Sequence, residues 1–241
     1  MGEKFSYDSR NSACRSRGVG HGAPYGRAVQ LLVLAKEPIP GLVKTRLCPP
    51  LSHQQAAQVT EACLADTLEA AVATGADRVV LVLAGTVGDW CPPGVDVVAQ
   101  TTGSLGDRLS GAWSAVDGPA VQIGMDTPQV TPAQLDAAMA RLADHLEGGP
   151  DALLGHATDG GWWLLGLRRW IPGVFTGVPM STDTTGKLQQ ARLRQLGLAV
   201  ECAMTLRDID TLEDLAAVAA TAPHTRVAGV FRTLHAPPPQ R

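Results

Sequence analysis

The chain has 241 residues and a formal net charge of −3, and hydrophobic residues make up 45 % of it. This length and composition suit one sizeable globular domain. The slightly negative charge argues against a general nucleic-acid-binding protein, which would carry a basic field. No apolar run is long enough to span a membrane. The five cysteines include no CxxC pair, so we expect reduced thiols and a cytoplasmic protein.

Both ends of the chain are expected to lie outside the folded domain. Residues 1–27 are polar and lack the apolar segment of a secretory signal, so we interpret them as a flexible leader. Residues 223–241 finish in a proline-rich stretch and are interpreted as a C-terminal extension or tail. The domain itself is therefore predicted to cover residues 28–222.

Between these ends, apolar runs alternate with segments that carry helical periodicity. The predicted strands cover residues 29–35, 78–84, 95–99, 120–123, 151–156, 162–167 and 199–204. The predicted helices cover residues 53–73, 103–116, 134–146 and 182–196, and a last helix follows a turn that begins at residue 208. Such alternation predicts an α/β fold with a mostly parallel central sheet and helices on both faces.

Three cations and a hydroxyl follow the first predicted strand. Lys36, Lys44, Thr45 and Arg46 lie on a loop that its prolines and Gly41 keep out of a helix. Lysine as a point charge and arginine as a bidentate fork suit a diphosphate at the end of a strand. The alternative is a solvated basic loop. The loop is not a Walker A motif, because it lacks the G-x-x-x-x-G-K-[ST] spacing of that motif.

A Gly-x-x-Gly pair precedes the second predicted helix. Gly103 and Gly106 would let backbone approach a nucleotide at the N-terminus of that helix, and Arg108 follows them. An ordinary helix entry is the alternative interpretation, since this short pattern is weak evidence by itself.

A carboxylate follows the predicted strand over residues 120–123. Asp126 comes after Gly124, and Pro128 ends the strand because proline cannot donate to a ladder. We therefore expect Asp126 at the carboxyl end of a central strand, where open α/β sheets bind ligands. There it suits a hard divalent cation that also holds phosphates. A plain turn or capping aspartate is the alternative.

Two further acidic stretches occur later in the chain. Asp159 precedes Gly160 and Gly161, whose backbones permit close ligand approach, although Asp-Gly is also the commonest hairpin turn. Asp208 and Asp210 would point the same way in an extended segment and could join a metal site. Their alternative role is to cap the helix that follows, with Asp210 or Thr211 as the N-cap.

These stretches together resemble a known family. The chain looks like the bacterial glycosyltransferase-A family once labelled DUF2064, over residues 30–219, and two of its motifs are also similar to 2-phospho-lactate guanylyltransferases. The residues that carry the resemblance are Lys36, Pro38, Pro40, Gly41 and residues 43–47, then Gly103, Leu105, Gly106 and Arg108, then Gly124, Asp126 and Pro128, then residues 159–163, and finally Asp208, Asp210, Thr211 and Asp214.

The resemblance implies a single GT-A, Rossmann-like domain that binds a nucleoside diphosphate-sugar and a small-molecule acceptor. Mg²⁺ or Mn²⁺ would lie on Asp126, with Asp208, Asp210 or Asp159 as a second ligand, and Asp159 is the candidate base. Two departures affect the acceptor: Trp162 and Trp163 replace the usual tyrosines, and Met180 replaces a tryptophan. The alternatives are a nucleotidyltransferase that uses an NTP and releases pyrophosphate, and a nucleotide-binding regulator without catalysis. A homodimer is a candidate assembly.

Overall fold

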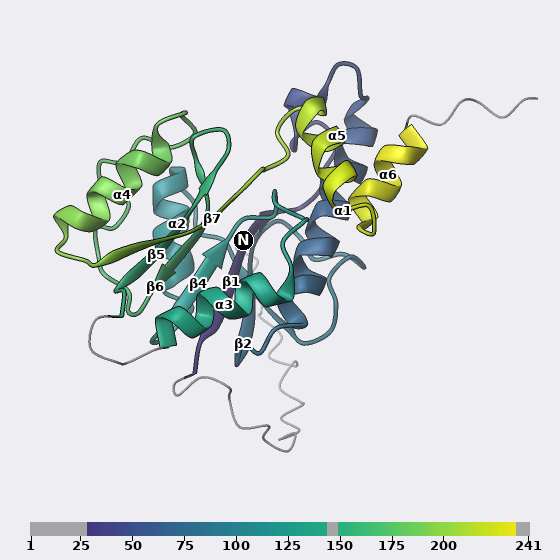
Figure 1. Ribbon diagram of the computed structural model, residues 1–241. Helices are drawn as coiled ribbons and strands as arrows, with labels where there is room; N and C mark the ends of the chain where they lie inside the picture. The colour runs from purple at the N-terminus through teal and green to yellow at the C-terminus, as the bar shows by residue number, and fades with distance from the viewer. Residues whose placement is uncertain (1–27, 144–148, 235–241) are drawn as a thin grey trace, which may run out of the picture.

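A seven-stranded sheet forms the centre of the computed structural model, which describes residues 28–143 and 149–234 (Figure 1). The strand order is β3-β2-β1-β4-β6-β5-β7. β6 runs antiparallel to β4 and β5, and the other pairs are parallel. The predicted α/β fold with a mostly parallel sheet is confirmed. The strands are β1 (Gln30–Lys36), β2 (Arg78–Ala84), β3 (Val95–Ala99), β4 (Ala120–Ile123), β5 (Ala152–Ala157), β6 (Trp162–Leu167) and β7 (Val200–Leu206).

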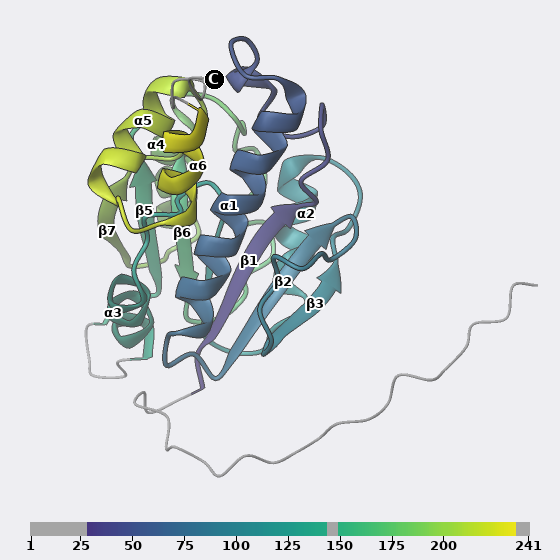
Figure 2. The same cartoon turned by 90° about the vertical axis from the view of Figure 1, so that its right-hand side faces the viewer.

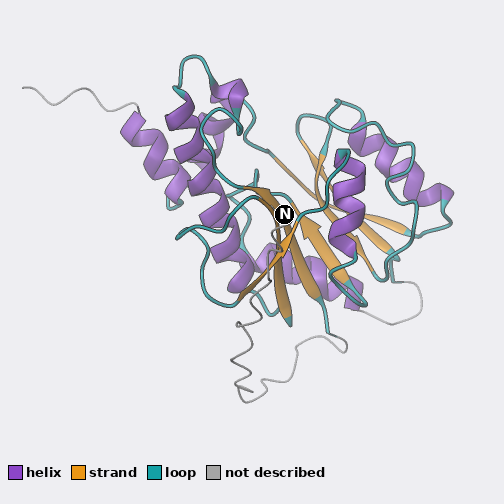
Figure 3. Ribbon diagram, turned by 180° about the vertical axis from the view of Figure 1, so that it is seen from behind, coloured by secondary structure: helices purple, strands orange, loops and turns teal. Residues whose placement is uncertain are grey.

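Helices cover both faces of this sheet, as the view from behind shows (Figure 3). One face packs against α1 and α3, and the other packs against α2 and α4, each through its own cluster of buried apolar side chains. The helices are α1 (His53–Val72), α2 (Leu105–Trp113), α3 (Pro132–Ala143), α4 (Thr185–Gln195), α5 (Leu212–Thr221) and α6 (Arg226–Leu234), and a short 3-10 helix η1 (Thr45–Leu47) precedes α1.

Local sequence signals place several of these elements where they were predicted. The strands β2, β3, β4 and β6 have the predicted bounds, and α1 ends one residue earlier than predicted. α1 begins at a capping box, in which the Ser52 hydroxyl accepts the Gln55 N–H and the Gln55 side chain accepts the Ser52 N–H. α3 begins at Pro132, and its predicted last residues fall outside the described part of the chain.

α6 lies in the segment that was interpreted as an extension beyond the domain. It packs beside α1 and α5 (Figure 2), and Val227 is fully buried in a third apolar cluster together with Cys63 and Leu215. The carboxylate of Asp66 on α1 accepts the backbone N–H groups of Arg226 and Val227, each at 3.0 Å. A carboxylate at a helix N-terminus satisfies N–H groups that have no partner within the helix and complements the helix dipole. The leader over residues 1–27 and the tail over residues 235–241 lie outside the described residues.

The parallel strands bring their carboxyl ends to one edge of the sheet. The loops after β1, β3, β4, β5 and β7 meet there, which is the edge where open α/β sheets bind ligands. Among the described residues, no helix has the length and apolar character needed to cross a membrane.

Candidate functional site

A cleft of about 760 Å³ lies at this edge of the sheet. Most of the residues predicted for the site line it, and they come from segments far apart in the sequence. Gly103, Gly106 and Gly160 are the predicted site residues that do not line it. Those that do are Lys36, Lys44, Thr45, Arg46, Arg108, Asp126, Asp159, Gly161, Asp208 and Asp210.

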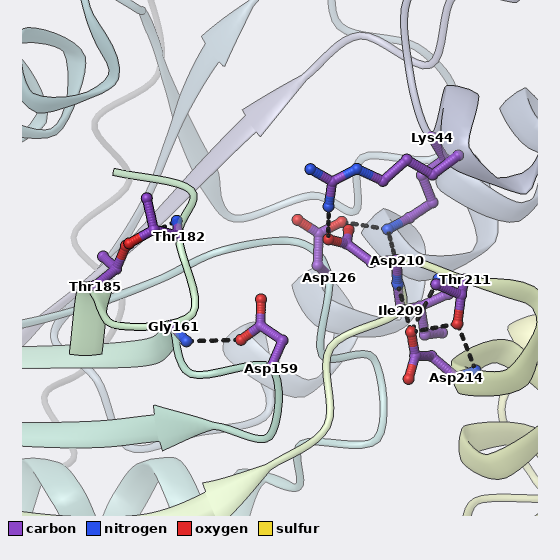
Figure 4. A network of polar contacts seen from close by, with 11 residues as sticks. Lys44, Asp126, Asp159, Gly161, Thr182, Thr185, Ile209, Asp210, Thr211 and Asp214 are labelled. Atoms are coloured by element: carbon purple, nitrogen blue, oxygen red, sulfur yellow. Dashed lines mark hydrogen bonds and ion pairs between the residues drawn. The ribbon is translucent and has the colours of Figure 1, made fainter. Parts of the chain in front are cut away.

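Lys44 and Asp126 form an ion pair at the floor of the cleft (Figure 4). The Lys44 Nζ lies 2.5 Å from the Asp126 Oδ1 and also donates to the carbonyl oxygen of Ile209. The Lys44 side chain is 5 % exposed and that of Asp126 45 % exposed. Burial by itself lowers the pKa of Lys44, but the adjacent negative charge and hydrogen bond of Asp126 outweigh it and raise that pKa above its usual value. Lys44 is therefore a charged, internally bonded ammonium.

Arg46 makes a similar contact nearer to solvent. Its Nη1 lies 2.7 Å from the Asp210 Oδ2, and its side chain is 67 % exposed. The backbone N–H of Ile209 also donates to the carbonyl oxygen of Asp126 at 2.9 Å. Thus the loop after β1 and the end of β4 together hold the segment over residues 208–210 against the cleft. Of the three cations that were predicted to contact a diphosphate, Lys44 and Arg46 already contact carboxylates of the chain.

Asp159, Asp208 and Asp210 form a compact group of carboxylates. One oxygen from each lies within 4.8 Å of the others. Burial, followed by the charge of Asp159, raises the pKa of Asp208 to about 6. Asp126 lies close enough for its charge to contribute to this shift, but it is not one of the three. The structure therefore brings the predicted ligands Asp208 and Asp210 together with Asp159, and it joins Asp126 to Lys44 instead.

The helix cap beside this group is formed by other residues. Thr211 is the N-cap of α5, its hydroxyl accepts the Asp214 N–H, and the Asp214 carboxylate accepts the Thr211 N–H. Asp214 also contacts Arg207 at 2.9 Å. Of the two candidate caps, Thr211 thus takes the role, and the carboxylates of Asp208 and Asp210 are left facing the cleft.

The Gly-x-x-Gly pair belongs to an ordinary helix entry. Ser104 caps α2 through a capping box with Asp107, and Gly103 precedes it with a φ of 111°. Arg108 extends from α2 into the cleft, where its Nη1 donates to the Gln100 Oε1 at 2.9 Å. The helix entry therefore contributes Arg108 to the site, while Gly103 and Gly106 shape the backbone outside it.

Gly160 holds the loop of Asp159 against the entry of α4. Its φ is 92°, and a Cβ at this position would lie 1.9 Å from the carbonyl oxygen of Asp183. The Gly186 N–H donates to the Gly160 carbonyl oxygen at 2.8 Å. The glycine is thus required by the close approach of two backbones.

Replacing Gly160 by alanine is expected to destabilise the domain more than the same change at Gly177. Gly177 has a φ of 74°, and a Cβ there would meet nothing within 4 Å, so alanine adds only backbone strain, about 1–2 kcal/mol. At Gly160 a steric clash of about 1–3 kcal/mol adds to that strain. Urea unfolding of the two variants measures the difference, and equal losses would show that the two loops separate easily.

Two glutamines that no sequence motif singled out, Gln100 and Gln122, also line the cleft. Gln100 follows β3, and its Nε2 donates to the carbonyl oxygens of Ala35 and Val82. Gln122 is fully buried within the apolar strand β4. A polar side chain inside a short buried strand was the available signal, because buried polar groups are usually retained for a specific bond.

The two tryptophans after Gly161 face opposite sides of the sheet, because successive side chains of a strand alternate. Trp163 is 4 % exposed in the cluster beneath α1 and α3, and its indole N–H donates to the Met204 carbonyl oxygen. Trp162 is half-buried on the other face and lines the cleft.

Comparison with solved structures places this fold among nucleotide-using transferases. The structure is similar to that of a candidate nucleotide-diphospho-sugar transferase from Desulfovibrio desulfuricans G20, with a TM-score of 0.75 and 25 % identity over 85 % of this chain and 94 % of that one. It shares its fold with CMP:2-keto-3-deoxy-manno-octonic acid synthetase solved with CTP, at a TM-score of 0.51 and 14 % identity over 82 % and 99 % of the two chains. It also shares its fold with a cytidylyltransferase from Leptospira borgpetersenii, at a TM-score of 0.52 and 12 % identity over 86 % of this chain and 93 % of that one.

No curated protein matches the sequence. The prediction of a transferase is confirmed at the level of the fold family by the similarity to the Desulfovibrio desulfuricans protein. One family model, described as an uncharacterised protein conserved in bacteria (DUF2064), matches residues 59–182, which is just over half of the chain. The chain therefore belongs to the DUF2064 family, within the nucleotide-diphospho-sugar transferase fold.

Proposed function

We propose that the protein is a metal-dependent glycosyltransferase that takes a nucleoside diphosphate-sugar as donor and a small molecule as acceptor. The observation that carries this proposal is the group of three carboxylates, Asp159, Asp208 and Asp210, beside cations in a cleft at the carboxyl edge of the sheet. Carboxylates and cations side by side suit a ligand that is itself a metal-bound diphosphate.

The carboxylate group fits Mg²⁺ or Mn²⁺. Its ligand atoms are hard oxygens, which these cations prefer. Burial, and after it the negative charge of Asp159, raises the pKa of Asp208, and a bound dication would favour the ionised carboxylate that both disfavour. We therefore assign the metal to Asp159, Asp208 and Asp210. When bound, it would offset the charge that develops on the leaving nucleoside diphosphate.

The other predicted residues then have separable roles. Lys36 and Arg46 are exposed cations in the cleft that can contact a diphosphate. Lys44 is the positioning residue, because its ammonium ties Asp126 to the backbone beside Asp208 and Asp210. Asp159 was predicted as the base for the acceptor, but its place in the carboxylate group favours a metal-ligand role.

The product released by the enzyme tests the proposal. Purified protein is incubated with UDP- or GDP-sugars and Mn²⁺, and the release of UDP or GDP is measured by chromatography. Release that requires Mn²⁺ and disappears in Asp210→Asn, but persists in the exposed Asp89→Asn control outside the cleft, would support glycosyl transfer. Pyrophosphate released from an NTP would replace this proposal by nucleotidyl transfer, and nucleotide binding without either product would point to a regulator.

Replacing Arg46 by alanine is expected to weaken nucleotide binding by about 1–3 kcal/mol, the scale of a charge-assisted hydrogen bond. Arg78 provides a matched control, because it forms a comparable surface ion pair with Asp96 at 2.6 Å outside the cleft. Calorimetry measures the nucleotide affinity of both variants, and only Arg46→Ala is expected to bind nucleotide more weakly than the wild type. An Arg46→Ala protein with the affinity of the wild type would remove this side chain from the nucleotide site.

A further inference from the structure

The side of the cleft that faces α2 carries a group of apolar side chains beside Arg108 and Gln100. Five apolar residues line this side of the cleft, and all of them belong to, or pack against, the apolar cluster on the α2 face of the sheet. They are Leu34, Leu105, Leu109, Trp162 and Met180. This apolar wall, defined by those five residues, contrasts with the charged end of the same cleft at Asp159, Asp208 and Asp210. A ligand that fills the cleft must therefore be charged at one end and largely apolar along this wall.

The amide of Gln122, another residue of the cleft lining, has a fixed orientation. The Gln122 Oε1 accepts the indole N–H of Trp113 at 2.9 Å. An indole nitrogen can only donate, so the oxygen of the amide must face Trp113 and the NH₂ group must face away from it. Trp113 is 1 % exposed, and its ring stacks on that of Trp170 with 5.7 Å between the ring centroids, so packing holds the indole N–H toward Gln122.

The NH₂ group of Gln122 has no hydrogen-bond partner in the part of the chain that the structure describes. Gln122 is fully buried and lines the cleft. A second donor of this kind is the Nε of Arg108, which is also buried without a partner there, while the same guanidinium is held by Gln100. Both unused groups are donors, and buried donors are rarely left without an acceptor.

Trp162 adds a flat surface to the same wall. Its ring stacks on Phe175 with 6.2 Å between centroids and 12° between planes, and Phe175 contacts Trp170 in turn. The indole is therefore held in place before any ligand binds. Flat, rigid aromatic surfaces of this kind bind other flat rings by stacking.

We propose that the apolar wall binds the nucleobase of the nucleotide and that Gln122 selects a base that carries a carbonyl group. A carbonyl oxygen accepts from the fixed NH₂ group, whereas the acceptors of adenine are ring nitrogens. N1 and N7 each lie beside its 6-amino group, whose hydrogens would face the same donor, and N3 lies beside the ribose. A sugar fits this wall poorly, because its hydroxyls need acceptors as well as donors. The inference rests on the proposed function, since it concerns the same nucleotide.

Calorimetry in the presence of Mn²⁺ tests the inference, with UDP, CDP, GDP and ADP as probes and pyrophosphate as a probe of the charged end alone. The wild type is expected to bind at least one of the carbonyl-bearing nucleotides about tenfold or more tightly than ADP. Gln122→Met removes the donors and should bring that ratio close to one, while the affinity for pyrophosphate stays unchanged.

Gln189→Met is the matched control, because Gln189 is equally buried but lies outside the cleft, and it should keep the wild-type ratio. Trp162→Leu provides a second variant, which should weaken all four nucleotides but not pyrophosphate. Equal binding of ADP by the wild type, or an unchanged ratio in Gln122→Met, would overturn the inference and leave the proposed function standing. If neither the nucleotides nor pyrophosphate bind in the presence of Mn²⁺, the inference and the proposed function are both overturned.

Discussion

Replacing Asp208 by asparagine is expected to abolish the stabilisation of the protein by Mn²⁺ and nucleotide. In the wild type, ligand at 100 times its dissociation constant adds about 2.7 kcal/mol to the free energy of unfolding. For a domain of this size, that corresponds to a rise in melting temperature of about 5–10 °C. The asparagine would keep one oxygen but lose the charge, and two carboxylates would then remain of the three that lie within 4.8 Å of one another.

The same variant is expected to be more stable than the wild type when no metal is present. Burial and the charge of Asp159 raise the pKa of Asp208 to about 6, so its ionised form is disfavoured in the folded state. The folded protein therefore holds this proton more tightly than the unfolded chain, whose aspartates titrate near pH 4. Hence the metal-free wild type should lose stability as pH rises from about 4 to 6, and Asp208→Asn should lose less.

Proton and metal compete for this carboxylate, so the affinity for Mn²⁺ should rise as pH increases through about 6 and level off above 7. Melting temperatures recorded between about pH 4 and 8, with and without Mn²⁺, measure both effects. Asp89→Asn is the control, because Asp89 is exposed and lies outside the cleft. An Asp208→Asn protein that Mn²⁺ stabilises as much as the wild type would remove Asp208 from the metal site.

Replacing Asp126 by asparagine is expected to destabilise the fold more than replacing its partner. Asparagine would leave the Lys44 ammonium, which is 5 % exposed, without a counter-charge. Breaking a buried pair in this way costs about 3–5 kcal/mol, and we expect about 2–3 kcal/mol because Asp126 is 45 % exposed. Lys44→Met should cost about 1 kcal/mol, since it removes the charge that needs a partner and leaves an aspartate that water can solvate.

The double variant Lys44→Met with Asp126→Asn separates pairing from other effects. If the pair is the cause, the double variant should be more stable than Asp126→Asn alone, because it contains no unpaired buried ammonium. Urea unfolding of the four proteins gives the coupling energy. Additive losses would show that Asp126 stabilises the fold through other contacts, such as the turn in which it lies. Nucleotide affinity with Mn²⁺ should fall in Lys44→Met as well, since Lys44 holds the backbone beside Asp208 and Asp210.

Local patterns in the chain were sufficient to predict the seven strands and the helices α1 to α5, whereas α6 was missed in a segment interpreted as an extension. Buried strands are short continuous apolar runs, and helix starts are marked by Ser52, Ser104 and Thr211, each three residues before its capping partner. These signals are local, because the bonds involved join residues that are near neighbours in the chain. The alternation of strands and helices was enough to place Asp126 at the carboxyl end of a central strand.

Which charged groups meet depends on long-range packing. Lys44 and Asp126 are 82 positions apart, and Arg46 and Asp210 are 164 positions apart. Their pairing depends on the strand order, which brings the ends of β1, β4, β5 and β7 together, and on α5 and α6 returning to pack beside α1. The same holds for Gln122, whose amide is oriented by a hydrogen bond from Trp113 on α2, a helix on one face of the sheet. Charge and hydrogen bonding act through distances in space, and a linear pattern does not contain those distances.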